Sequence, residues 1–211
     1  MKLLREMIQS LIKEEACASL NDKIHAGIEY MFENGIVLEY DLFAPDFVTV
    51  RLKNHLDGET IGFLEATKDV QTHGGECHGA YVVGMAKIIQ PIHRKAGLGA
   101  LLYDVALEIV GKDGLVADRN SVSHDAFRNW KYFKKSTDYI KKPLDNEKGE
   151  YTPGIPEDDC AGGSYFEHGG SMFIGDGEYF QKHPLNQAVV KKDQSKPTLK
   201  CIEANKEYLM G

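Results

Sequence analysis

The sequence predicts an α/β protein in which a central β-sheet is flanked by helices. Three observations support this fold class. Two strand-like segments between residues 47 and 66 indicate a β-hairpin. A strand, a glycine-rich loop and an amphipathic helix follow one another between residues 81 and 110. A short apolar strand and a second amphipathic helix complete the pattern by about residue 135.

The first 35 residues are expected to form a helical segment ahead of the sheet, because apolar residues recur there with helical spacing. One stripe lies near the N-terminus and consists of Leu3, Leu4, Met7, Ile8, Leu11 and Ile12. A second begins near Asp22 and consists of Ile24, Ile28, Met31 and Phe32. Asn34-Gly35 follows, and this pair is a good helix stop. Such stripes more often pack on a core than recruit a partner.

The first strands of the sheet are expected next. Residues 36–40 are apolar and rich in residues that favour strands. Residues 47–52 alternate between apolar and polar, as a half-buried strand does. Asp57-Gly58 is a strong turn signal, and it leads into a further strand at residues 61–66.

The middle of the chain combines a buried strand with two helices. Residues 81–89 form the longest strand candidate and are apolar on both faces, which is typical of a central strand. Residues 98–110 have helical apolar spacing, and Gly111 follows as a stop. After a short strand at residues 115–117, Ser123 is placed to cap a second helix. The apolar face of that helix consists of Ala126, Phe127, Trp130 and Phe133.

The periodic signal weakens after residue 135. Residues 141–170 hold prolines, glycines and acidic residues without a clear period. A strand at residues 172–180 and a terminal helix at residues 199–209 are expected beyond them. The chain therefore divides into an N-terminal helical segment, a core, and a C-terminal extension that packs on or completes the core, at residues 1–35, 36–140 and 141–211.

Composition and charge indicate a soluble, cytoplasmic protein. The net charge of -7 argues against a nucleic-acid partner, because duplex-binding proteins usually carry a basic patch. No apolar run is long enough to span a bilayer, and charges interrupt the apolar residues at the N-terminus as they would not in a signal peptide. Cys17, Cys77, Cys160 and Cys201 are too far apart for a metal site of the usual spacing, so free thiols in a reducing compartment are expected.

The loop at residues 90–100 carries the strongest chemical signal in the sequence. It lies between the predicted central strand and the helix that follows. The first amides of a helix have no internal partner, and the helix dipole is positive there. Glycines remove the Cβ atoms that would keep phosphate oxygens from the backbone, and Arg94 adds a donor fork suited to phosphate. The loop therefore predicts a pyrophosphate site.

Two other kinds of phosphate loop fit less well. A Walker loop requires G-x-x-x-x-G-K-[ST], which is absent from this chain. A dinucleotide loop requires G-x-G-x-x-G directly after its strand. Gly97 and Gly99 supply two of those glycines, but Leu102 stands at the third position and residues 90–96 intervene after the strand.

The loop resembles motif A of the GNAT acyltransferase superfamily, whose signature is [QR]-x-x-G-x-[GA]. Here the motif is Arg94-x-x-Gly97-x-Gly99, with Pro91 three residues before it. The order of predicted elements over residues 36–135 is also similar to that of the superfamily.

This resemblance implies a mixed central β-sheet in which the strand at residues 81–89 splays from the strand at residues 115–118. The pantetheine arm of acetyl-CoA, the implied co-substrate, would lie in the gap. The implied cofactor contacts lie at the end of the strand, along the loop and at the following helix cap, namely at Ile88, Ile89, Arg94, Lys95, Ala96, Gly97, Leu98, Gly99, Ala100 and Ser123.

The resemblance also implies an acceptor amine that attacks the thioester while a base takes its proton. Glu65 on the hairpin is the expected base, with Glu76, His78 and His124 as alternatives. Many GNAT enzymes protonate the departing thiolate with a Tyr in the pattern N-x-x-A-x-x-x-Y. This chain has Trp130 at that position, and an indole N–H is not usefully acidic.

Residues 118–130 and 152–160 are similar to GNAT-like proteins of tailed bacteriophages, which implies a host bacterial cytoplasm or a virion. Two functions are expected from these observations. One is an N-acetyltransferase that moves an acetyl group from acetyl-CoA to a primary amine of a small molecule or protein. The other is a catalytically inactive GNAT fold that acts as a virion or host-interaction component. A protein partner or a homodimer is compatible with both.

Overall fold

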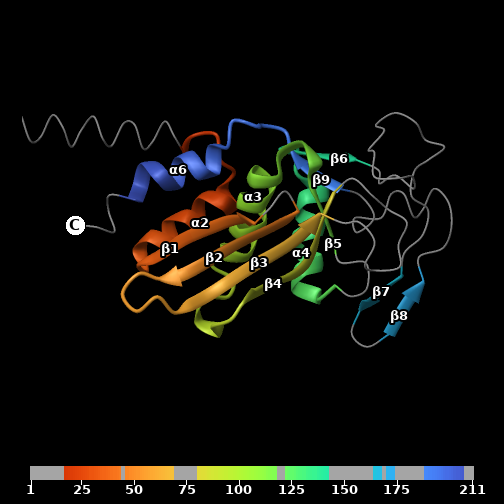
Figure 1. Ribbon diagram of the computed structural model, residues 1–211, viewed down its shortest axis with the longest axis horizontal. Coiled ribbons are helices and arrows are strands. Elements are labelled where there is room, and N and C mark those ends of the chain that lie inside the picture. Colours follow the sequence, from red (N-terminus) through yellow and green to blue (C-terminus); the bar gives the residue numbers. More distant parts are fainter. Residues whose placement is uncertain are drawn as a thin grey trace, which may run out of the picture.

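The chain has a mixed α/β architecture, in agreement with the predicted class. The computed structural model describes residues 17–43, 46–68, 80–117, 122–142, 164–167, 170–173 and 188–206. Within these residues a curled, seven-stranded mixed sheet is accompanied by four α-helices (Figure 1). The apolar stripe expected at residues 3–12 lies outside the described residues.

The large sheet has the strand order β1-β2-β3-β4-β5-β9-β6. Its strands are β1 (Ile36–Phe43), β2 (Phe47–Asn54), β3 (Thr60–Lys68), β4 (Tyr81–Ile88), β5 (Leu115–Ala117), β6 (Tyr139–Lys142) and β9 (Ala188–Lys191). Every neighbouring pair is antiparallel except β4 and β5, which are parallel. The expected hairpin and central strand are therefore confirmed.

A separate two-stranded sheet pairs β7 (Ser164–Glu167) with β8 (Gly170–Phe173). The strand expected at residues 172–180 overlaps the end of β8, and its remainder lies outside the described residues.

Three of the described helices gather along one side of the sheet (Figure 1). They are α2 (Asp22–Glu33), α3 (Leu98–Val110) and α6 (Pro197–Asn205). Helix α3 packs on β2, β3 and β4, and both α2 and α6 pack on α3. Helix α4 (His124–Lys135) contacts β6. Helix α6 begins before the expected residue 199, because Pro197 is well suited to the first turn of a helix.

The start and end of α2 follow from local chemistry. The Asn21 side chain caps the helix by accepting a hydrogen bond from the amide of Ile24 at 3.1 Å. Ile24, Ile28 and Met31 are buried, as their spacing predicts. The chain leaves the helix through Gly35, whose φ of +60° is a conformation that other residues rarely adopt.

Strand β9 and α6 come from the expected C-terminal extension, and both are built into the core. Strand β9 lies between β5 and β6 in the sheet. Its Lys191 side chain is buried and donates hydrogen bonds to Asp104 and Glu108 of α3, each at 2.6 Å, and to Thr198 of α6 at 2.8 Å. The hydroxyl of Tyr139 donates to Asp104 at 2.6 Å. One buried polar cluster thus joins α3, β6, β9 and α6.

The expectation of free thiols is wrong for two of the four cysteines. Cys17 and Cys201 form a disulfide, with their Cα atoms 4.9 Å apart. It links the chain just before α2 to α6. Residues 184 positions apart in the sequence can be brought together only by the tertiary fold, so sequence spacing gave no sign of the pair. Cys77 and Cys160 lie outside the described residues, and the cysteines no longer argue for a reducing compartment.

Candidate functional site

The parallel strands β4 and β5 separate after three residue pairs. Tyr81, Val82 and Val83 pair with β5, and pairing stops there because β5 ends at Ala117. On its other edge β4 stays paired with β3, but the register shifts so that Gly84 is an extra residue, a β-bulge. No described residue pairs with the second half of β4 on the β5 side.

The burial of β4 corrects one expectation from the sequence. The strand at residues 81–89 is central in strand order, but its second half is not buried on both faces. Met85 is 52% exposed, and Lys87 is exposed as well. Burial on both faces requires a layer packed on each face. Helix α3 packs on β4, and Ala86 and Ile88 are half-buried while the alternating Met85 and Lys87 are exposed.

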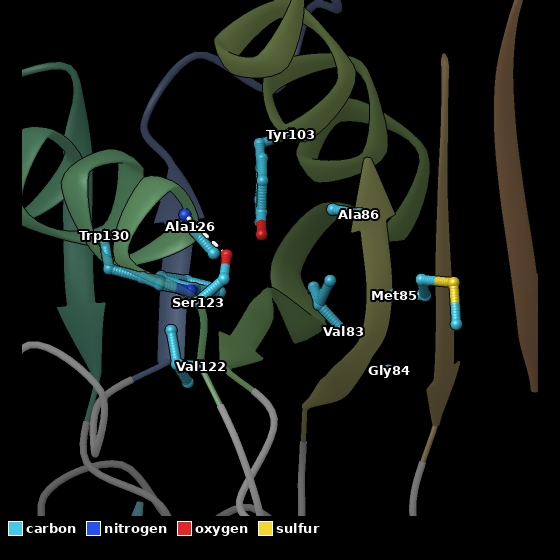
Figure 2. Close-up of a pocket in the computed structure, with 9 residues that line it drawn as sticks. All are labelled: Val83, Gly84, Met85, Ala86, Tyr103, Val122, Ser123, Ala126 and Trp130. Atoms are coloured by element: carbon cyan, nitrogen blue, oxygen red, sulfur yellow. Dashed lines mark hydrogen bonds between the residues drawn. The ribbon is translucent and has the colours of Figure 1, made fainter. Parts of the chain in front are cut away.

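A cleft runs along the open part of β4, facing α3 and α4. Its smaller compartment has a volume of about 180 Å³ and its larger compartment about 520 Å³. Both compartments are lined by Ala86, Tyr103, Ser123 and Ala126, so they adjoin. Figure 2 shows the smaller compartment between β4 and the start of α4. The cleft thus lies where described pairing between β4 and β5 is limited to three residue pairs.

The predicted phosphate loop forms one end of the larger compartment. The chain turns through a short 3-10 helix at Pro91–His93 and enters α3 at Leu98. Lys95 and Gly97 both have left-handed backbone conformations, with φ of 70° and 82°. The hydroxyl of Tyr30 on α2 lies 3.0 Å from His93 Nδ1, which ties the loop to α2.

The two glycines of the motif are required for different reasons. A Cβ atom on Gly97 would lie 3.0 Å from the carbonyl oxygen of Lys23 and 3.1 Å from Cα of Gly27, so packing against α2 already demands glycine. A Cβ atom on Gly99 would meet only the Asn129 amide nitrogen, at 3.6 Å, an ordinary contact. Glycine is unfavourable inside a helix. Packing therefore does not explain why position 99 is a glycine. An anion bound close to the backbone would explain it.

The larger compartment is lined by five cationic side chains and one carboxylate, those of Lys23, Lys87, Arg94, Lys95, Arg128 and Asp125. Lys23 comes from α2, and its Nζ atom lies 3.4 Å from Asn129 Oδ1 and 4.6 Å from the centre of the Tyr132 ring. Within the described part of the chain, no carboxylate pairs with Lys23. Burial lowers the pKa of Lys23. A bound anion would reverse that shift by stabilising the charged form.

The structure gathers most of the predicted contacts along the larger compartment. Its lining includes Ile88, Arg94, Lys95, Gly97, Gly99, Ala100 and Ser123. Three predicted residues do not line it. Leu98 is 1% exposed and faces the core, Ala96 faces a neighbouring hollow against α2, and the Ile89 amide donates to the carbonyl of Ile61 on β3 at 2.8 Å.

The Ile89 bond also identifies the backbone groups that face the cleft. Successive residues of a strand point their amides and carbonyls to opposite edges. Because Ile89 points to β3, the backbone groups of Ile88 and Ala86 point to the edge that β5 leaves open. Of the expected pair, Ile88 presents its backbone groups to this edge, as Ala86 does, whereas the Ile89 amide is bonded to β3.

The expected base is close to the cleft but does not line it. Glu65 lies on β3 directly opposite Met85, one strand away from the smaller compartment. Glu76 and His78 lie outside the described residues, as does the side chain of His124. Ser123 caps α4 as expected, with its hydroxyl accepting from the amide of Ala126 at 3.2 Å.

Sequence reasoning did not single out Tyr103, Lys23 or Asn129, all of which line the cleft. Tyr103 occupies one position in the helical repeat of α3, and nothing in the repeat marks it as facing a cavity. Lys23 and Asn129 belong to helices that are separated in sequence by strands β1 to β5 and helix α3. Only the hydrogen bond between Lys23 and Asn129 across the end of the cleft identifies these two residues.

Among the described residues, no cluster of three or more His, Cys, Asp or Glu side chains is arranged to hold a metal ion. None of the described helices combines the length and the apolar character that crossing a bilayer requires. Searches against protein-family models, curated proteins and solved structures find no match to this chain.

Proposed function

We propose that this chain is an acyltransferase of the GNAT type that moves an acetyl group from acetyl-CoA to a primary amine of a small molecule or protein. The observation that carries the proposal is the cleft itself. It extends from the end of β4–β5 pairing to the glycine loop at the start of α3. Its shape suits a long, flexible ligand with a diphosphate at one end.

The diphosphate would lie at the loop. The first amides of α3 point out of the helix, and Gly99 has no side chain to block them. Lys23, Arg94 and Lys95 add positive charge from two elements. Oxygens of phosphate accept charge-assisted hydrogen bonds from such groups, and these are stronger than bonds between neutral groups.

The pantetheine arm would lie along the open edge of β4. That edge offers the backbone groups of Ala86 and Ile88, which have no β5 partner. The amides of pantetheine can pair with these groups much as an added strand pairs with a sheet edge. The thioester then reaches the smaller compartment beside Gly84 and Met85.

In the proposed reaction the amine nitrogen attacks the thioester carbonyl, and the carbon–sulfur bond breaks to release the CoA thiolate. The amine loses a proton to a base or to water. Glu65 is our candidate base, acting through water, because it lies one strand from the smaller compartment.

One observation favours a catalytically inactive protein as the second candidate. Trp130 lies on α4 where many GNAT enzymes carry their acidic Tyr, and it is 2% exposed. On this alternative the fold binds a virion or host protein and the cleft has no substrate. Binding of acetyl-CoA distinguishes the two candidates.

The test is calorimetric titration of the whole chain with acetyl-CoA, comparing wild type with Gly99→Glu. A Cβ atom at this position meets only the Asn129 amide nitrogen, at 3.6 Å, and a carboxylate suits the first turn of a helix, so the fold should be retained. It places negative charge where the diphosphate would bind. We expect affinity to fall at least about tenfold, the equivalent of one charge-assisted hydrogen bond.

Ile92→Glu is the matched control. Ile92 is 79% exposed and lines neither compartment, yet it lies in the same loop region and the substitution changes the net charge equally. It should leave affinity nearly unchanged. Absence of acetyl-CoA binding by wild type, or equal binding by Gly99→Glu, would contradict the proposal.

A further inference from the structure

The side chain of Tyr103 reaches from α3 into the cleft. It is 3% exposed and lines both compartments. Figure 2 shows its hydroxyl pointing away from α3 into the space between Ser123 and Val83. That space is the smaller compartment, which lies beside the bulge in β4.

Two aromatic rings hold Tyr103 in this orientation. The Trp130 ring packs edge-on against it with centroids 5.4 Å apart, and the Phe133 ring lies 5.8 Å away. Trp130 thus fills the α4 position with a group that cannot act as an acid, while its ring supports a phenol from the neighbouring helix. A phenol is a better hydrogen-bond donor than an indole because it is more acidic.

The Tyr103 hydroxyl makes no hydrogen bond within the described part of the chain. Tyr139 provides the contrast, because its buried hydroxyl donates to Asp104 at 2.6 Å. Buried polar groups in folded proteins are almost always paired with a protein group, water or a ligand. A hydroxyl that points into a cavity is therefore positioned for a partner in that cavity.

We propose that Tyr103 donates a hydrogen bond to the thioester sulfur of the acyl-CoA and stabilises the thiolate that leaves. This inference rests on the proposed function and adds a catalytic residue to it. The carbon–sulfur electron pair moves to sulfur, and the phenol O–H bond stays intact while it donates to the new thiolate. The thiolate takes its proton from water after release. No proton need leave Tyr103.

The electrostatics of the compartment suit this role. Burial raises the pKa of Tyr103, so the hydroxyl stays protonated throughout the range in which amines react. A neutral donor in a partly dehydrated compartment stabilises a developing anion more strongly than one in bulk water. The benefit appears as sulfur gains charge, and it therefore affects turnover more than substrate binding.

The test is Tyr103→Phe in the full chain, which keeps the ring and its packing. Because the hydroxyl has no partner among the described residues, thermal stability should not fall. We expect acetyl-CoA to bind within about threefold of wild type. With a panel of primary amines, kcat should fall about 10- to 100-fold while KM for acetyl-CoA stays nearly constant. Tyr40→Phe is the control, since Tyr40 lies on β1, is 50% exposed and lines neither compartment.

A second readout requires no acceptor amine. The thiol pKa of bound CoA can be followed by thiolate ultraviolet absorbance during a pH titration. We expect it to be about one pKa unit higher in Tyr103→Phe than in wild type, because the variant lacks the donor to the thiolate. Tyr40→Phe should match wild type.

The outcomes separate the two proposals. If wild type binds acetyl-CoA and Tyr103→Phe shows the wild-type thiol pKa, the Tyr103 proposal is wrong and the cleft assignment stands. If wild type does not bind acetyl-CoA or CoA, the proposed function fails and the Tyr103 proposal fails with it.

Discussion

At the scale of residues, the motif glycines show that one signature can have two physical origins. Gly97 is required by its backbone conformation and by the close approach of Gly27. Gly99 has neither requirement. A sequence pattern treats them alike, but only Gly99 argues for a ligand close to the helix start.

This difference predicts opposite effects of the same substitution. Gly97→Ala should destabilise the protein by about 2 kcal/mol, because alanine is strained at positive φ and its Cβ would press on the backbone of α2. Gly99→Ala should be neutral or stabilising by up to about 1 kcal/mol, because alanine favours helices. Denaturant unfolding measures both, and equal destabilisation by the two substitutions would contradict this account.

The same scale shows how far the candidate site could be predicted. Arg94, Gly97 and Gly99 are close in sequence, and their pattern places them correctly at the start of α3. Tyr103 and Lys23 could not be found in this way. Whether a residue of an apolar helix faces a cavity depends on neighbours contributed by other elements. Those neighbours cannot be recognised from the residues close to it in the sequence.

At the scale of elements, the cleft depends on the unequal lengths of β4 and β5 and on the extra residue Gly84. The sequence indicated both strands through their apolar runs. It did not indicate the bulge, because a single inserted residue hardly changes a pattern of alternation.

The buried cluster that joins four elements also supports a prediction. Lys191→Met would leave Asp104 and Glu108 without their buried cation. Removing one partner of a buried ion pair typically costs about 3–5 kcal/mol, and we expect a loss of that size in denaturant unfolding. Burial and the Asp104 carboxylate raise the pKa of Tyr139, which remains a neutral donor and cannot replace the cation.

Lys192→Met is the control for this prediction. Lys192 follows directly in sequence but is exposed. The same substitution there should change the free energy of unfolding by less than about 0.5 kcal/mol. Similar losses at the two positions would show that the buried cluster has no special role.

At the scale of the whole molecule, a disulfide joins the N-terminal part of the described chain to its C-terminal part. The Cys17–Cys201 disulfide closes most of the chain into one loop. Reducing it, or replacing both cysteines by Ser, should destabilise the protein by about 3 kcal/mol, because the unfolded chain regains conformational freedom. Neither cysteine lines the cleft, so acetyl-CoA affinity should be unchanged. An unaltered unfolding midpoint after reduction would contradict this prediction.

The expected division into three segments does not follow the boundaries of the sheet. The boundary at residue 140 falls within β6, and β9 from the C-terminal segment lies between β5 and β6. The core at residues 36–140 therefore lacks a strand of its own sheet. The C-terminal segment, which was expected to pack on the core or to complete it, contributes a strand to the sheet.

Local order along the chain was enough to place helices α2, α3 and α4, the strands from β1 to β5, and a loop suited to an anion. Helical and strand periods, caps and turns act over a few neighbouring residues, so they can be detected in the amino-acid order. The insertion of β9, the buried Lys191 cluster, the disulfide and the direction of Tyr103 were settled by packing. These contacts join residues far apart in sequence, and folding alone brings them together.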